Sequence, residues 1–150
     1  MDQTLARARV FLLANARLLE RALFEVRFAG RPSAAVQRAV RAYRNEDGGL
    51  GHALEPDLRC AESQPLFAEV GLDALWQAGC RDQELALSLC GYLETVCDGE
   101  GLVPPLLDSA RNSPHAPHWS APVAPGLNPT AGICGLLHYQ GVSHPWLRRA

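Results

Sequence analysis

The chain has 150 residues, of which 47% are hydrophobic and 20% charged, and its formal net charge is −2 at pH 7. This length and balance are typical of one globular domain spanning residues 1–150 and exclude an intrinsically disordered chain. No basic run indicates nucleic-acid binding, no apolar run reaches the roughly 18 residues of a membrane span, and the first residues lack a signal-peptide core. We therefore expect a cytoplasmic protein with neither a nucleic-acid partner nor a membrane span.

The first two predicted elements are helices. Apolar residues at helical spacing predict one long amphipathic helix over residues 3–28, closed by Gly30. A second helix is expected to begin at Pro32, to carry Tyr43 on its apolar stripe and to end at Gly48–Gly49. Glycine is suited to that end because it accepts the positive φ of a helix C-terminus.

Two further helices follow a polar loop. The third is expected to begin near Ser63, with Pro65 in its first turn, and to stop at Gly79. Its residues Phe67–Trp76 place apolar groups on several faces, which is typical of an inner helix. Asp82 is a predicted N-cap of the fourth helix, whose apolar stripe has a polar back and so indicates an outer helix.

The last third begins with a predicted long loop. Residues 98–127 contain six prolines, too many for an ordinary helix interior. Asn128–Pro129 then starts a fifth helix over Thr130–Tyr139, which is apolar nearly all round and is expected to be another inner helix. Ser143 is predicted to cap a sixth helix that runs to the last residue.

A turn motif links the chain to a known family. Tyr43 precedes Glu46, Asp47 and the turn Gly48-Gly49-Leu50-Gly51, and the apolar helix Phe67–Trp76 follows. This order resembles the repeats of the prenyltransferase and terpenoid-cyclase (α/α) toroid superfamily. The segments 15–25, 45–59, 127–137 and 144–150 also resemble an uncharacterised group of bacterial prenyltransferase-like proteins that are longer than this chain.

The resemblance implies antiparallel helical hairpins that form part, about half, of an (α/α) toroid, with about three hairpins in its N-terminal half. A repeat of this kind cannot bury its apolar face alone. We therefore expect the half ring to need a partner, either a missing C-terminal half of a longer protein or a second copy of the chain.

Two carboxylates mark the third predicted helix. Glu69 and Asp73 are four residues apart and so share one helix face among apolar neighbours. If that face lines the ring, the pair can hold a divalent cation such as Mg²⁺ for a diphosphate, or one carboxyl can act as an acid. The alternative is a solvent-facing stripe, or pairing with arginines of an adjacent helix.

The loop before this helix adds further candidates. Asp47 is expected to brace its glycine turn. Glu55, Asp57, Arg59 and Gln64 have no turn or cap to explain them, so they are equally candidates for an acid/base or binding site and for surface positions.

Metal and cyclase motifs are poorly matched. Protein prenyltransferases hold zinc with an Asp, a Cys and a His, but Asp57, Cys60 and His52 do not reproduce that spacing, which argues against zinc. Terpene cyclases use an Asp-x-Asp-Asp motif, which the chain lacks. The five cysteines are odd in number and scattered, which favours reduced thiols.

The proline-rich loop carries the last candidates. Residues Asn112 to Trp119, with His118 and Trp119, form a polar and aromatic patch that is a candidate lid over the ring mouth near Asn128. The alternative is that Trp119 fills a gap between hairpins while the prolines stiffen the crossing.

Three functional hypotheses follow. As an enzyme of the transferase or cyclase kind, the chain would bind or transform an isoprenoid-like apolar ligand. Glu55, Asp57 and Glu69 would be its catalytic residues, and Arg59, Gln64, Asp73, His118, Trp119 and Asn128 would bind substrate. The second hypothesis is a non-catalytic helical-repeat binding or assembly scaffold. The third is a carbohydrate-active (α/α) barrel enzyme, which needs two carboxylates across a cleft.

Overall fold

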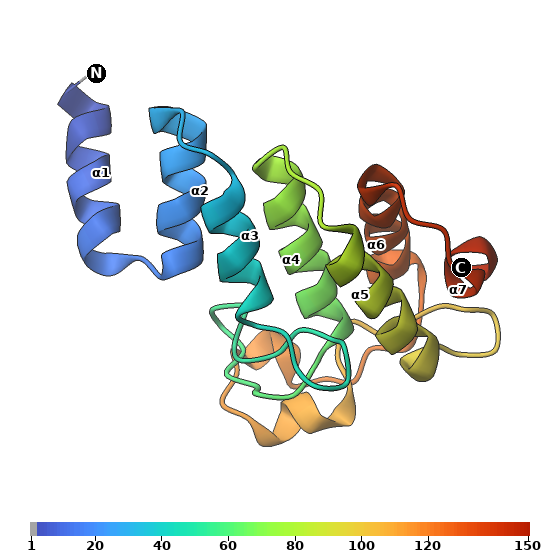
Figure 1. Cartoon of the computed structure of the whole chain (residues 1–150). Helices are drawn as coiled ribbons and strands as arrows, with labels where there is room; N and C mark the ends of the chain where they lie inside the picture. The colour runs from blue at the N-terminus through green and yellow to red at the C-terminus, as the bar shows by residue number, and fades with distance from the viewer. Residues whose placement is uncertain (1–2) are drawn as a thin grey trace.

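Seven α-helices and two short 3₁₀ helices form the regular structure of residues 3–150, the part of the chain that the computed structural model describes (Figure 1). The α-helices are α1 (Gln3–Asn15), α2 (Leu18–Ala29), α3 (Ala34–Arg41), α4 (Pro65–Gln77), α5 (Gln83–Val96), α6 (Leu127–Gln140) and α7 (Pro145–Arg149), and the 3₁₀ helices are η1 (Asp108–Asn112) and η2 (Pro117–Trp119). Within this part, strand-like pairing is confined to isolated bridges, so the predicted all-α class is confirmed. None of these helices is long and apolar enough to cross a bilayer.

The single helix predicted over residues 3–28 is wrong, because the chain leaves the helix around Arg17. Arg17 is extended, with φ −71° and ψ 168°. Its guanidinium donates to the carbonyl oxygens of Ala53 and Leu54 at 2.8 and 3.0 Å, which ties α2 to the loop of residues 42–64. Apolar periodicity alone does not reveal this break, since it continues on both sides of it.

The second helix is also shorter than predicted. It ends at Arg41 instead of Gly48–Gly49, and a backbone hydrogen bond of 2.8 Å from Gly51 N–H to Tyr43 O closes the turn that follows. Gly48 has φ 87°, and a Cβ atom there would lie 2.7 Å from Ser88 Oγ. The glycines therefore serve a tight turn packed under α5, and they do not end the helix.

Asp47 braces this turn, as predicted. Its Oδ1 accepts the N–H of Gly49 at 2.9 Å and the hydroxyl of Ser63 at 2.8 Å. The second bond ties the turn to the residues just before α4, so the loop is closed at both ends.

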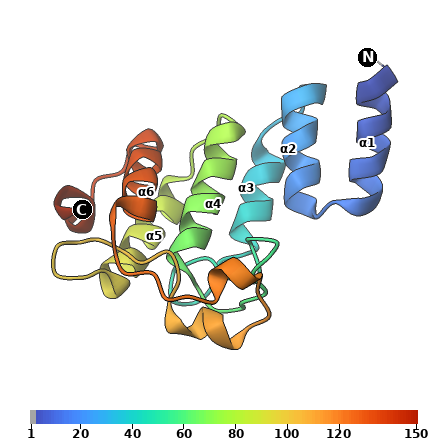
Figure 2. The same ribbon diagram turned by 180° about the vertical axis from the view of Figure 1, so that it is seen from behind.

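The helix α4 is the centre of the packing. It contacts α3, α5 and α6, and Figure 2 shows it beside α6 with α5 behind them. Pro65 is its first residue, and Gly79 follows its end with φ 64°, as predicted. Its buried residues are Pro65, Phe67, Ala68, Gly71, Leu72, Ala74 and Leu75. The predicted interior position applies to these residues and not to Trp76, which is 52% exposed.

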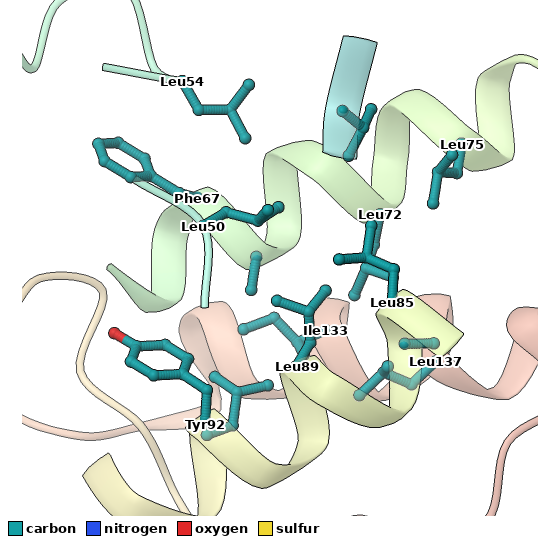
Figure 3. Close-up of a cluster of buried hydrophobic side chains, with 14 of the residues drawn as sticks. Leu50, Leu54, Phe67, Leu72, Leu75, Leu85, Leu89, Tyr92, Ile133 and Leu137 are labelled. Carbon is teal, nitrogen blue, oxygen red and sulfur yellow. The ribbon is translucent and has the colours of Figure 1, made fainter. Parts of the chain in front are cut away.

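Figure 3 shows how side chains of the loop, α4, α5 and α6 meet in one hydrophobic core. Leu50 and Leu54 reach it from the loop, Leu85 and Leu89 from α5, and Ile133 from α6. Five free cysteines accompany this packing, and Cys60 and Cys90 are buried. The expected reduced thiols are therefore present.

Of the two predicted helix caps, one is confirmed and the other is wrong. Asp82 caps α5 as predicted, because its Oδ1 accepts the N–H of Leu85 at 3.2 Å. Arg41 of α3 donates two bonds to the same carboxylate, at 2.6 and 2.7 Å. The prediction that Ser143 caps the last helix is wrong, because His144 is the N-cap of α7 and its Nδ1 accepts the N–H of Trp146 at 3.2 Å.

The proline-rich segment between α5 and α6 is a packed crossing that contains η1 and η2. The backbone N–H of Leu66 donates to Pro105 O at 3.0 Å, and that of Arg59 donates to Pro114 O at 2.8 Å. The indole N–H of Trp146 donates to Gly101 O at 3.0 Å. The segment thus joins the start of α4 to the C-terminal helix.

Substitution of Gly71 tests the close packing of α4. A Cβ atom there would overlap Leu50 Cδ1 and lie 3.2 Å from Val40 Cγ1. We expect Gly71→Ala to lower the free energy of unfolding by about 1–3 kcal/mol, because the core is overpacked. Gly91→Ala on α5 is the matched control: nothing lies within 4 Å of its Cβ position, so it should stabilise by about 0.5–1 kcal/mol. Urea unfolding measures both, and a neutral Gly71→Ala would contradict this packing.

The Asp82 carboxylate predicts a pH dependence of stability. Its side chain is 1% exposed, and the Arg41 guanidinium lowers its pKa below the usual 3.8. We expect Asp82→Ala to cost about 2 kcal/mol at pH 7, since both the cap and the ion pair are lost. Because the folded pKa is depressed, this contribution is complete above about pH 4 and disappears as the pH falls through the folded pKa.

Urea unfolding of both proteins between pH 7 and pH 3 would therefore show the two stabilities converging at the acidic end. Glu84→Ala is the control, because Glu84 also pairs with Arg41 but its side chain is 66% exposed. It should change stability by less than about 1 kcal/mol. Equal losses in the two variants would contradict the role given to Asp82.

Candidate functional site

Three carboxylates from α4 and the loop before it line one pocket of about 400 Å³, which we call the acidic pocket. Glu69 and Asp73 come from α4, and Glu55 comes from the loop before it. Val70 of α4 and Leu136 of α6 supply the apolar wall. The pocket therefore combines acidic groups with an apolar surface between two packed helices.

Local structure explains why these side chains meet. Residues four apart lie on the same face of a helix, so Glu69 and Asp73 point to the same side of α4. The loop brings Glu55 there because Leu54 is fully buried in the core and its carbonyl oxygen is held by Arg17. On α6, a Cβ atom at Gly132 would overlap Glu69 Oε1, so glycine leaves the space that this carboxylate occupies.

The environment makes two of the carboxyls weaker acids than usual. Partial burial raises the pKa of Glu69, and the neighbouring charge of Asp73 raises it further. Burial likewise raises the pKa of Glu55 and Asp57 adds to the effect, while Arg17 and His118 oppose it. Asp73 accepts a hydrogen bond of 2.5 Å from Gln77 Nε2. Perturbed carboxyls in a concave site are typical of functional groups, although structural networks also produce them.

A second group of predicted residues lies beside the pocket. His118 Nε2 is 3.2 Å from Asp57 Oδ2, and the indole N–H of Trp119 donates to Asp57 Oδ1 at 2.9 Å. The two rings are 4.7 Å apart, and Trp119 packs against the hydrophobic core. This packing agrees with the interpretation of Trp119 as a gap filler. Through His118, the group also acts on the charge of Glu55.

The remaining sequence candidates do not line the acidic pocket. Gln64 is fully buried; its amide donates to Ser109 Oγ at 2.9 Å and accepts the N–H of Leu107 at 2.7 Å. These bonds brace the loop from inside, so the ligand-binding role predicted for Gln64 is not supported. Arg59 and Asn128 are exposed.

A neighbouring hollow was missed by the sequence analysis. It measures about 380 Å³ and shares Asp73 and Leu136 with the acidic pocket. Its other walls are Trp76, Ala131, Gly132, Gly135 and Tyr139. The signal in the sequence was the small-residue pattern of α6, where two glycines three residues apart leave one face of the helix without side chains. Together the two hollows form an apolar and acidic face of α4 and α6, which we call the α4–α6 face.

The chemistry available to a metal is limited. Among residues 3–150, no three His, Cys, Asp or Glu side chains are arranged to hold a metal ion. Cys60 donates from its thiol to Glu62 Oε2 at 3.1 Å, and burial raises the pKa of that thiol. A thiolate is the form that binds zinc, so this cysteine is poorly suited to a zinc site.

Comparisons of the chain with protein-family models, with curated proteins and with solved structures gave no match. The function of the α4–α6 face is therefore inferred from its geometry and chemistry.

Removal of the charge on Asp73 tests the coupling in the acidic pocket. We expect Asp73→Asn to lower the pKa of Glu69, because the like charge is removed, but to leave it above the usual value, because burial is the larger cause. Carbon-13 NMR titration of the glutamate carboxyls measures this shift. Asp108→Asn is the control, since that side chain is 91% exposed on the proline-rich segment. An unchanged Glu69 titration would show that the two carboxyls are not coupled.

Proposed function

We propose that the chain is part of an (α/α) toroid of the prenyltransferase and terpenoid-cyclase type, and that its α4–α6 face binds an apolar ligand with a polar head. The observation that carries this proposal is the convergence of Glu55, Glu69 and Asp73 on one pocket with apolar walls. Small-molecule sites are commonly concave and mostly apolar, with a few convergent polar groups that fix orientation. The α4–α6 face has this composition.

The ligand tail would lie along the apolar part of the face. Trp76 and Tyr139 supply two aromatic side chains there, and Leu136 continues the surface into the acidic pocket. Glycines on α6 allow a tail to approach the helix closely. An isoprenoid-like chain fits such a surface because it is apolar along its length.

The charges in the pocket select the ligand head. Three carboxylates and no basic side chain line it, and Arg17 acts on Glu55 from outside the lining. A protonated amine would bind directly through charge-assisted hydrogen bonds, and a hydroxyl would bind more weakly. A diphosphate would be repelled and would need a divalent cation such as Mg²⁺ between itself and the carboxylates.

The raised pKa values of Glu55 and Glu69 suit one catalytic step. A carboxyl that keeps its proton closer to neutral pH can donate it to a bound group as a general acid. Asp57 would act as a positioning residue, because its carboxylate is engaged by His118 and Trp119. Transfer or cyclisation would follow only if such a donation reached a reactive double bond or leaving group.

Three ligands that share a farnesyl tail and differ in their head group test this selectivity. We expect farnesylamine to bind most tightly and farnesol less tightly, and we expect farnesyl diphosphate to bind only when Mg²⁺ is added. Because loss of a hydrogen bond to a charged group costs about 1.5–3 kcal/mol, Glu69→Gln should weaken farnesylamine binding by about tenfold or more. Isothermal titration calorimetry or quenching of tryptophan fluorescence measures the affinities.

Glu94→Gln is the matched control, because Glu94 is an exposed acidic residue of α5 outside the pocket. Farnesylamine binding should also weaken as the pH falls, and at a higher pH than an ordinary glutamate would give, since the pKa of Glu69 is raised. Absence of binding by all three ligands would refute the proposed function. Equal effects of Glu69→Gln and Glu94→Gln would show that the ligand head does not bind in the acidic pocket.

A further inference from the structure

The N-terminal helices expose an unusual amount of apolar surface. Between Gln3 and Asn15, α1 has no buried residue, and its only substantial packing partner in the described chain is α2. Val10 is 71% exposed and Phe11 66% exposed. A helix of this length is marginal in water without a packed face. Figure 1 shows α1 at one end of the molecule, away from the core around α4.

A groove continues this surface between α2 and α3. It measures about 740 Å³, and its lining includes the arginines Arg21, Arg31 and Arg38 beside Glu25 and several alanines, among them Ala35. Its apolar lining consists mostly of alanines, which let another helix or aromatic side chain approach closely. Its charged lining is basic except for Glu25, and Arg9 already binds Glu25 at 2.7 Å. We call α1 together with this groove the N-terminal docking surface.

Charge is divided unevenly along the chain. Residues 1–44 contain nine arginines and three acidic residues, whereas residues 45–150 contain five arginines and thirteen acidic residues. Part of this difference is neutralised within the molecule, since Arg41 and Arg44 pair with Asp82 and Glu84 of α5. Of the arginines that line the groove, Arg31 lies 3.9 Å from Glu25, and within residues 3–150 none of them forms an ion pair with Asp82 or Glu84. A basic end and an acidic body therefore coexist in one molecule.

We infer that the N-terminal docking surface of one copy binds the acidic body of a second copy of this chain. The occupant must offer apolar groups and negative charge, and the body of the same chain offers both. Exposed Leu87 and Leu127 supply apolar groups there, and the thirteen acidic residues supply the negative charge. Two basic N-terminal surfaces would repel each other, so the contact joins unlike surfaces, head to tail. A standard interface takes about 20–30 residues from each side, which α1, α2 and α3 can supply.

The inference does not depend on the ligand proposed for the α4–α6 face. A head-to-tail contact adds copies until a ring closes or the chain of copies is capped. We expect the average mass to rise with concentration above that of the 16.3 kDa monomer. Because opposite charges drive the contact, its affinity should fall by about tenfold or more as NaCl is raised from about 0.05 M to about 0.5 M. Sedimentation velocity and light scattering measure both effects.

A variant with a blocked groove distinguishes this contact from non-specific association. Ala35 is exposed at the N-terminal turn of α3, so Ala35→Glu should fold normally while it places a charge in the groove. This variant keeps its acidic body. It should fail to self-associate, yet in excess it should cap wild-type assemblies and convert them to dimers of one wild-type and one variant chain. Ala124→Glu adds the same charge to an exposed loop of the acidic body, so it should associate at least as strongly as the wild type.

Each other outcome overturns the inference. A wild-type protein that stays monomeric at low salt and high concentration has no such contact. Association that salt strengthens is not driven by charge complementarity. An Ala35→Glu chain that does not enter wild-type assemblies would mean that the groove is used by both partners. If circular dichroism shows that Ala35→Glu is unfolded, Arg38→Glu on the exposed rim replaces it, with the same expected capping.

Discussion

The packing of α4 against α3, α5 and α6 holds the core of the fold together. Gly71 allows Leu50 of the preceding loop to contact the helix directly, and Leu54 follows it into the same core. Because those two leucines are buried, they hold the loop of residues 42–64 against α4. The same burial places Glu55 above the helix face that carries Glu69. The acidic pocket is thus a consequence of how the core is filled.

The acidic pocket keeps groups together that repel one another. The pKa values of Glu55 and Glu69 are raised because burial and a neighbouring carboxylate both disfavour the charged form. Stability alone would be served better by an apolar or paired arrangement at this place. The buried carboxylate of Asp82 differs from these carboxyls, because Arg41 and the N-terminus of α5 donate hydrogen bonds to it. Incompletely paired carboxylates in a concave, partly apolar setting suit the ligand site that we propose.

The N-terminal helices α1 and α2 differ from the other helices in how little of their surface is buried. They contribute little to the core, since α1 buries nothing and α2 buries only Leu19 and Phe24. Their apolar and basic surface is matched by the acidic remainder of the chain. Unlike surfaces at different parts of one molecule favour head-to-tail contacts. The proposed ligand site and the proposed assembly surface therefore belong to separate parts of one molecule.

Local sequence patterns were sufficient to predict the helical class, the positions of α4, α5 and α6, the Asp82 cap and the turn braced by Asp47, because each depends on spacing or on a few neighbouring residues. They also placed Glu69 and Asp73 on one face, since that follows from helix geometry. The break at Arg17 could not be predicted in this way, because it depends on carbonyls more than thirty residues away. The position of Glu55 in the pocket and of Gln64 in the interior likewise became known only from the folded chain, because long-range packing sets both and no local pattern records it.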